Sequence, residues 1–241
     1  MTVTAQAIPM LSDNYAWLLT DSKTGMTAIV DPAEAAPAIE ALKAKGNRLD
    51  FIFLTHHHAD HIGGVPDLVA AYHPHVVGNE ADASRLPPLD MKVHEGPTFA
   101  FGSAQVRVMD VPGHTCGHVA YFIEDGNILL PGDTLFSLGC GRLFEGSAAQ
   151  MFESIQKFKT LPDDTLVCAG HEYTQSNAKF ALSVDPDNEA LKARALEVEA
   201  RRAQGLPTLP VTLGQERACN PFLRAKTVEE FAALRLAKDT F

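Results

Sequence analysis

The chain has 241 residues, of which 46% are hydrophobic and 21% are charged, and its formal net charge is −10 at pH 7. This composition is ordinary for a soluble globular protein and excludes a chain that is disordered throughout. Non-specific binding of nucleic acid requires a basic field, so the acidic balance also excludes that function and no nucleic-acid partner is expected.

Targeting signals are not evident in the sequence. Residues 1–6 have neither a basic start nor an apolar segment, so they do not predict a secretory signal. A run of about 18 apolar residues, as a membrane span requires, is also missing. The cysteines are widely spaced without a Cys-x-x-Cys pair, which favours reduced thiols in a cytoplasmic protein. We take a monomer as the working expectation.

In chain order, short strands are predicted over residues 3–8, 15–20 and 28–30, followed by a helix around Ile39 and Leu42 that ends near Gly46. The nearly continuous apolar run 49–54 is typical of a strand buried on both faces. A short helix over 65–72 and a strand over 75–78 come next. Residues 98–111 and 119–130 then read as two hairpins, the second turning at the Asp-Gly pair 125–126.

The later part of the chain changes character. Ser147 and Gln150 have capping-box spacing before an apolar helical stripe that includes Met151 and Phe158, which we interpret as core. A strand over 165–169 follows. Beyond it, residues 174–183, 187–204 and 227–238 predict helices and no convincing strand. We therefore expect a mixed α/β catalytic domain over residues 1–173 and a helical domain over residues 174–241.

Potential metal ligands follow the ends of several predicted strands. After turns of Thr, Gly and Pro, the chain presents His56, His114, Asp133 and His171. Functional groups gather at such strand ends in layered α/β folds. With His58, Asp60 and His61 there are seven donors, too many for one tetrahedral ion but suited to two ions that share a carboxylate. His57 points away from its neighbours in extended chain, so we expect it to be solvated or to support a ligand.

Four motifs occur in order: Thr-His-x-His-x-Asp-His from Thr55, Gly-His-Thr-x-Gly-His from Gly113, Gly-Asp-Thr-Leu-Phe from Gly132 and Gly-His-Glu-Tyr-Thr from Gly170. Together they resemble the metallo-β-lactamase superfamily. The last two, with the segment from Asn220-Pro221-Phe222 onward, resemble the glyoxalase II (hydroxyacylglutathione hydrolase) family. The resemblance implies a four-layer αββα sandwich followed by a smaller all-helical C-terminal domain.

The same resemblance divides the ligands between two ions, which spacing alone does not do. It assigns His56, His58 and His114 to one ion, Asp60, His61 and His171 to the other, and makes Asp133 the bridging ligand. The ions are expected to be Zn²⁺, with Fe or Mn as alternatives, because all three accept histidine and carboxylate donors.

The activity that the resemblance implies is hydrolysis of S-D-lactoylglutathione to D-lactate and glutathione, a step of methylglyoxal detoxification. Two divalent ions lower the pKa of a bridging water from about 15.7 to about 7. The metal-bridging hydroxide then attacks the thioester carbonyl, and Asp60 is expected to orient that hydroxide. A thiol leaves readily as thiolate, so a general acid is not essential.

The substrate is expected to be a small-molecule glutathione thioester, which carries carboxylates. Residues 217–241 hold five basic and three acidic side chains, a local charge of about +2 in an acidic chain. By resemblance the glutathione contacts are Arg142, Tyr173, Arg235 and Lys238, and Phe144 stands where a tyrosine is common in the family. Arg224 and Lys226 are interpreted as solvated charges.

Other residues of these chemical types have plainer expectations. His118 either holds a ligand in place or is simply structural, and His73, His75 and His94 are expected to have no metal role. Cys116 and Cys168 are expected to be small buried apolar residues.

Three other functions compete with the hydrolase. A mononuclear iron dioxygenase of the same superfamily would act on a glutathione persulfide. A β-lactam hydrolase is disfavoured by the cationic helical tail, and a non-catalytic scaffold is disfavoured by the complete ligand set.

Overall fold

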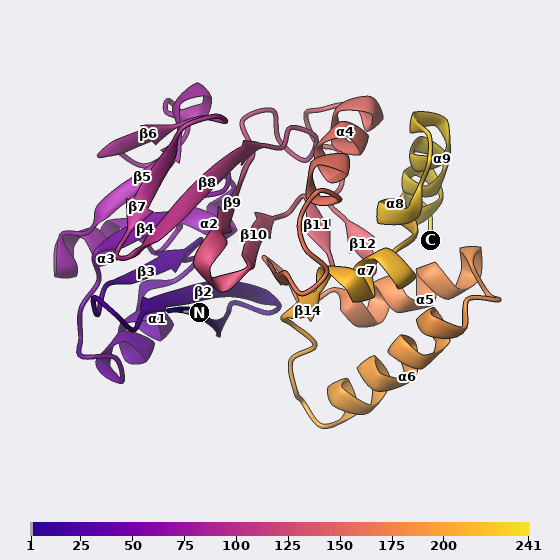
Figure 1. Ribbon diagram of the computed structural model, residues 1–241, viewed down its shortest axis with the longest axis horizontal. Helices are drawn as coiled ribbons and strands as arrows, with labels where there is room; N and C mark the ends of the chain where they lie inside the picture. The colour runs from indigo at the N-terminus through magenta and orange to yellow at the C-terminus, as the bar shows by residue number, and fades with distance from the viewer. Residues whose placement is uncertain (1) are drawn as a thin grey trace.

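The computed structural model describes residues 2–241, in which two six-stranded sheets pack against each other (Figure 1). The first sheet has the strand order β1-β2-β3-β4-β5-β6, with antiparallel pairing from β1 to β3 and parallel pairing from β3 to β6. Parallel neighbours require crossover connections, which here contain the helices that cover this sheet. The strands are β1 (Val3–Met10), β2 (Asn14–Asp21), β3 (Thr27–Val30), β4 (Phe51–Phe53), β5 (His75–Asn79) and β6 (Met91–Val93).

The second sheet has the order β14-β13-β10-β9-β8-β7, and only its β10–β13 pair is parallel among the described residues. Its strands are β7 (Thr98–Phe101), β8 (Ala104–Asp110), β9 (Val119–Ile123), β10 (Ile128–Gly132), β13 (Leu166–Ala169) and β14 (Val211–Thr212). A separate short hairpin of β11 (Leu135–Phe136) and β12 (Gly139–Cys140) follows β10.

Helices cover the outer faces of the two sheets. Along β2, Trp17 and Leu19 point into the core between the sheets, whereas Leu18 points to the other face and packs with Leu42 and Leu68 of the covering helices. This alternation is what a strand buried on both faces requires. The four-layer αββα prediction is thus confirmed. The helices of these layers are α1 (Ala35–Lys43), α2 (Ala59–Ile62), α3 (Val65–Tyr72) and α4 (Ala148–Phe158).

The C-terminal part is helical as predicted and lies beside the second sheet, in orange to yellow in Figure 1. It also contributes one strand that was not expected, β14, which pairs with β13. Two residues carry no readable periodicity, so only tertiary pairing defines this strand. The helices are α5 (Thr174–Val184), α6 (Glu189–Ala203), α7 (Leu213–Cys219), α8 (Pro221–Arg224) and α9 (Val228–Asp239).

The turn between β9 and β10 differs from the expected two-residue Asp-Gly turn. Residues Glu124–Gly126 form a 3₁₀ turn, η2, and Asn127 takes the left-handed conformation with φ of 45°. The Asp125 carboxylate accepts a hydrogen bond from the Thr2 backbone N–H at 2.7 Å instead of stabilising a local turn. Asparagine tolerates left-handed geometry, and the connection spans residues 124–127, two positions more than expected.

The ends of strands from both sheets meet at one edge of the sandwich. Thr55, after β4, accepts a backbone hydrogen bond from Val119 at 2.9 Å, and Gly132, at the end of β10, accepts one from Gly170 at 3.2 Å. The loops that carry the predicted ligands are therefore joined directly by backbone contacts. Within residues 2–241, none of the helices has the length and apolar character needed to cross a membrane.

Candidate metal centre

The loop after β4 is fixed by one buried carboxylate. Asp31, which follows β3, accepts hydrogen bonds from the Thr55 backbone N–H at 2.8 Å and from the Thr55 hydroxyl at 2.6 Å. The same hydroxyl lies 3.0 Å from Nδ1 of His56. Because the hydroxyl donates to Asp31, it accepts from His56 Nδ1, which leaves the Nε2 lone pair of His56 for a ligand.

His56, His58 and His114 form the first group of converging donors. Nδ1 of His58 lies 3.1 Å from Nε2 of His56 and 3.1 Å from Nε2 of His114. Nδ1 of His114 donates to the carbonyl oxygen of Arg142 at 2.9 Å, so its Nε2 also carries a free lone pair. Three imidazole lone pairs that face one point match the donor set of a transition-metal ion.

Asp60, His61 and His171 form the second group. The two Nε2 atoms of His61 and His171 are 3.3 Å apart, and Oδ2 of Asp60 is 3.5 Å from Nε2 of His171. On the far side of each ring a carboxylate accepts from Nδ1: Asp31 from His61 at 3.0 Å and Asp13 from His171 at 2.9 Å. Such carboxylate–histidine pairs orient imidazoles that bind metals.

Asp133 lies between the two groups. Its Oδ2 is 3.5 Å from Nε2 of His114 and 3.3 Å from Nε2 of His171, and its Oδ1 is 3.5 Å from Nε2 of His61. Oδ1 is buried and has no hydrogen-bond partner among the described residues. A buried carboxylate oxygen without a donor is costly unless a cation meets it.

The electrostatics of the centre point to the same conclusion. Burial, reinforced by neighbouring histidines, lowers the pKa of His56 and of His58, which keeps these rings neutral. Burial also acts to lower the pKa of His61 and His171, but the nearby Asp133 carboxylate outweighs it and raises both. The raised pKa values show that positive charge is favoured beside Asp133, and a bound metal ion would supply such charge. The residues present fit divalent cations, and the centre is a divalent metal site.

The metal centre opens into a cavity of about 590 Å³. The predicted substrate residues Arg142, Phe144, Tyr173, Arg235 and Lys238 all line this cavity, as do His58, Asp60, His114, Asp133 and His171. Segments that are far apart in sequence therefore meet in one space. A concave site with a few convergent polar groups is the usual form of a small-molecule site.

Known protein families match both parts of this chain. The family model for the metallo-beta-lactamase superfamily matches residues 11–171, and the model for the hydroxyacylglutathione hydrolase C-terminus matches residues 172–241. A hydroxyacylglutathione hydrolase from Acidiphilium cryptum is 56% identical over 238 residues, which cover 99% of this chain and 97% of the relative. The chain belongs to the hydroxyacylglutathione hydrolase family.

Another hydroxyacylglutathione hydrolase, from Rhodospirillum rubrum, is 49% identical and covers 100% of this chain and 99% of its own. Among solved structures, ETHE1 from Myxococcus xanthus superposes with a TM-score of 0.74 at 25% identity, covering 98% of this chain and 90% of that protein. The BLEG-1 B3 metallo-beta-lactamase gives a TM-score of 0.71 at 25% identity, covering 92% of this chain and 100% of that protein. The relatives of high identity favour the hydrolase over the dioxygenase alternative.

The cationic side chains of this hydroxyacylglutathione hydrolase family member are held in different ways. Arg235 is buried, donates to the Cys140 carbonyl oxygen at 2.8 Å and pairs with Asp239 at 2.9 Å. Lys238 donates to the Ser176 carbonyl oxygen at 3.3 Å, and its Nζ lies 5.3 Å and 5.4 Å from the ring centroids of Phe180 and Phe241. Arg142 is mostly exposed. Its Nε lies 3.9 Å from the Asp239 carboxylate. Of these three cations in residues 2–241, Lys238 is therefore the one without a carboxylate within ion-pair distance.

The aromatic residues of the cavity pack on ligand rings. The Tyr173 ring stacks on His171 at 4.6 Å with an interplanar angle of 8°. The Phe144 ring meets His114 edge-on at 5.1 Å and is itself exposed. Each ring therefore packs against a histidine of the converging donor groups and adds apolar surface to the cavity wall.

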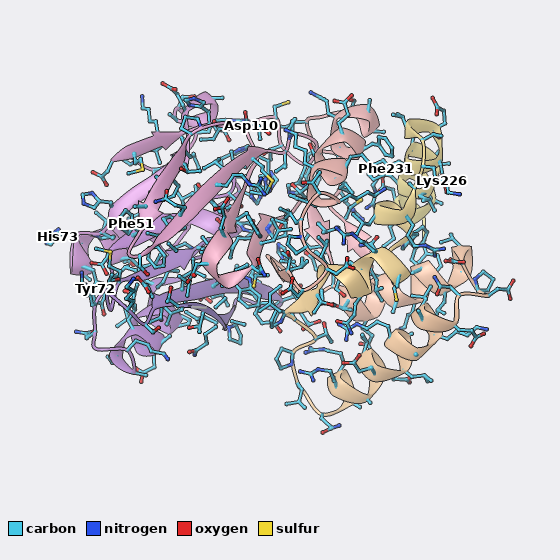
Figure 2. All side chains as sticks on the ribbon, in the orientation of Figure 1. Phe51, Tyr72, His73, Asp110, Lys226 and Phe231 are labelled. Atoms are coloured by element: carbon cyan, nitrogen blue, oxygen red, sulfur yellow. The ribbon has the colours of Figure 1, made fainter. Side chains whose placement is uncertain are left out.

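Two other histidines of the motifs support the centre without joining the groups of converging donors. His118 is buried, stacks on His56 at 4.6 Å, and accepts from the Asp133 backbone N–H at 3.1 Å. His57 turns away, and its Nδ1 lies 2.9 Å from a carboxylate oxygen of Asp82. His73 ends α3 at the outer edge of the molecule, far from the centre (Figure 2).

One expectation about cysteines is wrong. Cys168 is buried as expected, but Cys116 is exposed. In the loop after β8, His114 faces the metal centre and Thr115 is buried, whereas the Cys116 side chain is exposed. The sequence does not predict this exposure, because loop residues lack the periodicity that distinguishes buried from exposed positions in helices and strands.

Sequence reasoning also missed the residues that orient the ligands. Asp31 and Asp13 accept from His61 and His171, and Asn14 donates to Oδ2 of Asp60 at 3.0 Å. The signal available was weak: Asp31 precedes Pro32 at the end of a strand, and Asp13-Asn14 is a turn pair. Both patterns indicate a turn, and neither shows that the carboxylate also contacts a histidine.

Proposed function

We propose that this protein hydrolyses S-D-lactoylglutathione to D-lactate and glutathione with two divalent ions, preferably Zn²⁺. The observation that carries the proposal is a shared cavity: the metal donors His58, His114 and Asp133 line the same space as Arg235 and Lys238. A thioester carbonyl at the donors would leave the glutathione carboxylates within reach of these cations.

In this proposal His56, His58 and His114 hold one ion, and Asp60, His61 and His171 hold the other, with Asp133 shared. When bound, the ions polarise a carbonyl oxygen and lower the pKa of a water from about 15.7 to about 7. Asp60 is restrained by Asn14 and lines the cavity, so its carboxylate is placed to orient a water and accept its proton. The departing thiol has a pKa of about 8.5, so it leaves as thiolate without a protonating side chain.

We assign substrate binding to residues 174–241 together with the segment that carries Arg142 and Phe144. Arg235 and Lys238 stand three positions apart on α9 and line the cavity from one side. Phe144 brings no hydroxyl to the cavity, and the absence of one hydrogen bond costs about 0.5–1.5 kcal/mol. Such a cost weakens binding without excluding the substrate.

The decisive experiment measures S-D-lactoylglutathione hydrolysis and metal content on the same sample. We expect D-lactate and free thiol to form at equal rates with about two ions per chain. About one iron per chain, with oxygen uptake on glutathione persulfide and no thioester hydrolysis, would establish the dioxygenase alternative instead. Nitrocefin turnover without thioesterase activity would establish a β-lactam hydrolase.

Lys238→Ala should raise KM for the glutathione thioester by about tenfold, because a charge-assisted contact worth about 1.5 kcal/mol or more is lost. The value of kcat should stay within about twofold, since this contact is made equally before and during the reaction. Steady-state kinetics at low ionic strength provide the measurement.

Lys226→Ala is the matched control because it removes the same charge from an exposed position at the edge of the molecule, near α8 and α9, outside the cavity (Figure 2). We expect it to leave KM unchanged. Equal effects of the two substitutions would indicate general electrostatic attraction and would remove Lys238 from the substrate site.

We also propose that the protein acts as a monomer in the cytoplasm. Its four cysteines are free thiols, as expected in a reducing compartment. Size-exclusion chromatography with light scattering tests the monomer: a mass near 26.0 kDa supports it, and a multiple of that mass refutes it.

A further inference from the structure

A second cluster of charged side chains lies beside the metal centre and is not used by the proposed mechanism. The Arg85 guanidinium bridges two carboxylates: its Nε donates to Oδ1 of Asp82 at 2.5 Å, and its Nη2 donates to Oε2 of Glu145 at 3.2 Å. Nη1 of Arg85 also donates to Glu145. Asp82 is only 2% exposed, and its other oxygen lies 2.9 Å from Nδ1 of His57. The four residues thus form one connected network.

The Glu145 end of this network belongs to the segment 141–146, which carries Arg142 and Phe144 into the cavity. This segment is attached to the loop of His114 at several points. Oε2 of Glu145 accepts from the Cys116 backbone N–H at 2.7 Å, and the Phe144 backbone N–H donates to the His114 carbonyl oxygen at 3.3 Å. The Arg142 carbonyl oxygen in turn accepts from Nδ1 of His114. The segment and the His114 loop therefore form one unit.

The Asp82 end is anchored rigidly to the body of the protein. Asn79, at the end of β5, caps the turn that contains Asp82 and donates from its side chain to the Gly117 carbonyl oxygen at 3.0 Å. A Cβ atom at Gly117 would lie only 2.5 Å from the Asp82 carboxyl carbon, so the backbone at Gly117 packs closely against the Asp82 side chain. Hydrogen bonds from Arg85 hold the pKa of Glu145 at about 2, so the Glu145 carboxylate stays charged at neutral pH.

We propose that Arg85 is a positioning residue that fixes the segment 141–146, and with it Arg142 and Phe144, at the substrate cavity; this inference rests on the proposed function for its kinetic consequence. His57, the central residue of the three consecutive histidines, attaches the loop after β4 to the same network through Asp82. An isolated exposed ion pair is worth about 0–1 kcal/mol. Here one guanidinium forks across two carboxylates, which adds geometric restraint to the attraction.

The first test is Arg85→Met, which keeps an unbranched apolar stem and removes the guanidinium group. We expect KM for the thioester to rise about threefold to tenfold, because Arg142 and Phe144 lose their fixed position. We expect kcat to remain within about twofold and the metal content to match the wild type, since none of the assigned ligand side chains contacts Arg85. Arg85→Lys should recover part of the effect because it restores the charge.

Glu145→Gln should raise KM to a similar extent, and the double variant should raise it no further, because both single changes break the same link. Arg48→Met is the matched control, since it breaks the surface pair of Arg48 with Asp50, whose atoms lie 2.6 Å apart. The control should leave KM unchanged. Additive effects of Arg85→Met and Glu145→Gln would overturn the proposal.

A second readout uses the metal-free protein and needs no catalysis. The Cys116 backbone N–H is protected by Glu145, and the Cys116 thiol is the exposed one in the described chain. In Arg85→Met we expect amide exchange across residues 113–118 and 141–146 to accelerate about tenfold or more, with faster alkylation of Cys116. Exchange and KM that both match the wild type would overturn the proposal, as would a loss of metal with unchanged exchange. If the wild type hydrolysed no glutathione thioester, the proposed function would fail while exchange still tested Arg85.

Discussion

Asp133→Ala is expected to remove at least one of two bound metal ions and to lower kcat by more than about 100-fold. Its carboxylate is the group that faces both sets of donors, with Oδ1 at 3.5 Å from His61 Nε2 and Oδ2 at 3.5 Å from His114 Nε2. Changes that only disturb the support of a ligand already cost about 10–100-fold, so loss of a shared ligand must cost more. Metal content per chain and kcat, measured on one sample, provide the test.

Asp21→Ala is the matched control for Asp133→Ala. Asp21 is also fully buried, but it accepts hydrogen bonds from the Ser103 backbone and the Thr24 hydroxyl, both at 2.7 Å, away from the metal donors. The control should lower the free energy of unfolding by about 1–3 kcal/mol and retain both ions. Two ions and nearly normal kcat in Asp133→Ala would refute the shared-ligand assignment.

The strand ends that carry His56, Asp133 and His171 were predictable because their signals are local. A short run of apolar residues indicates a buried strand. The Thr, Gly or Pro residues that follow indicate where the strand ends and the chain turns. The structure brings these three side chains together, as the common edge of a layered α/β fold requires. Grouping the donors into two sets required more than spacing, because it depends on which loops from the two sheets face each other.

Residues that act through space were not predictable from one sequence. Asp31 meets His61, and Arg85 meets Glu145, across segments that the fold alone brings together. Within its own stretch of sequence, each of these side chains looks like a polar residue exposed to solvent. The short strands β11, β12 and β14 were missed for a related reason: two residues have no period, and their pairing comes from the surrounding structure.

Asp31→Asn is expected to weaken metal binding by about 10–100-fold, which is the usual cost when the partner of a ligand histidine is changed. Oδ2 of Asp31 accepts from both the Thr55 hydroxyl and Nδ1 of His61. An amide nitrogen at that position would face the Nδ1–H with a second donor, so His61 would move or carry its proton on Nε2 instead. Because His61 belongs with Asp60 and His171, the ion held by that group should be lost first in a chelator competition.

Asp13→Asn makes the same chemical change at the carboxylate that accepts from Nδ1 of His171, so the losses of metal affinity in the two variants can be compared. Asp31 is buried, whereas the side chain of Asp13 is 39% exposed. Water can replace the lost acceptor at Asp13 but not at Asp31, where the unmatched group also costs about 1–3 kcal/mol of folding free energy. We therefore expect a clearly smaller loss of metal affinity in Asp13→Asn, with little change in Tm of the metal-free protein. Equal losses in the two variants would show that burial of the supporting carboxylate does not govern how tightly this centre holds its metal.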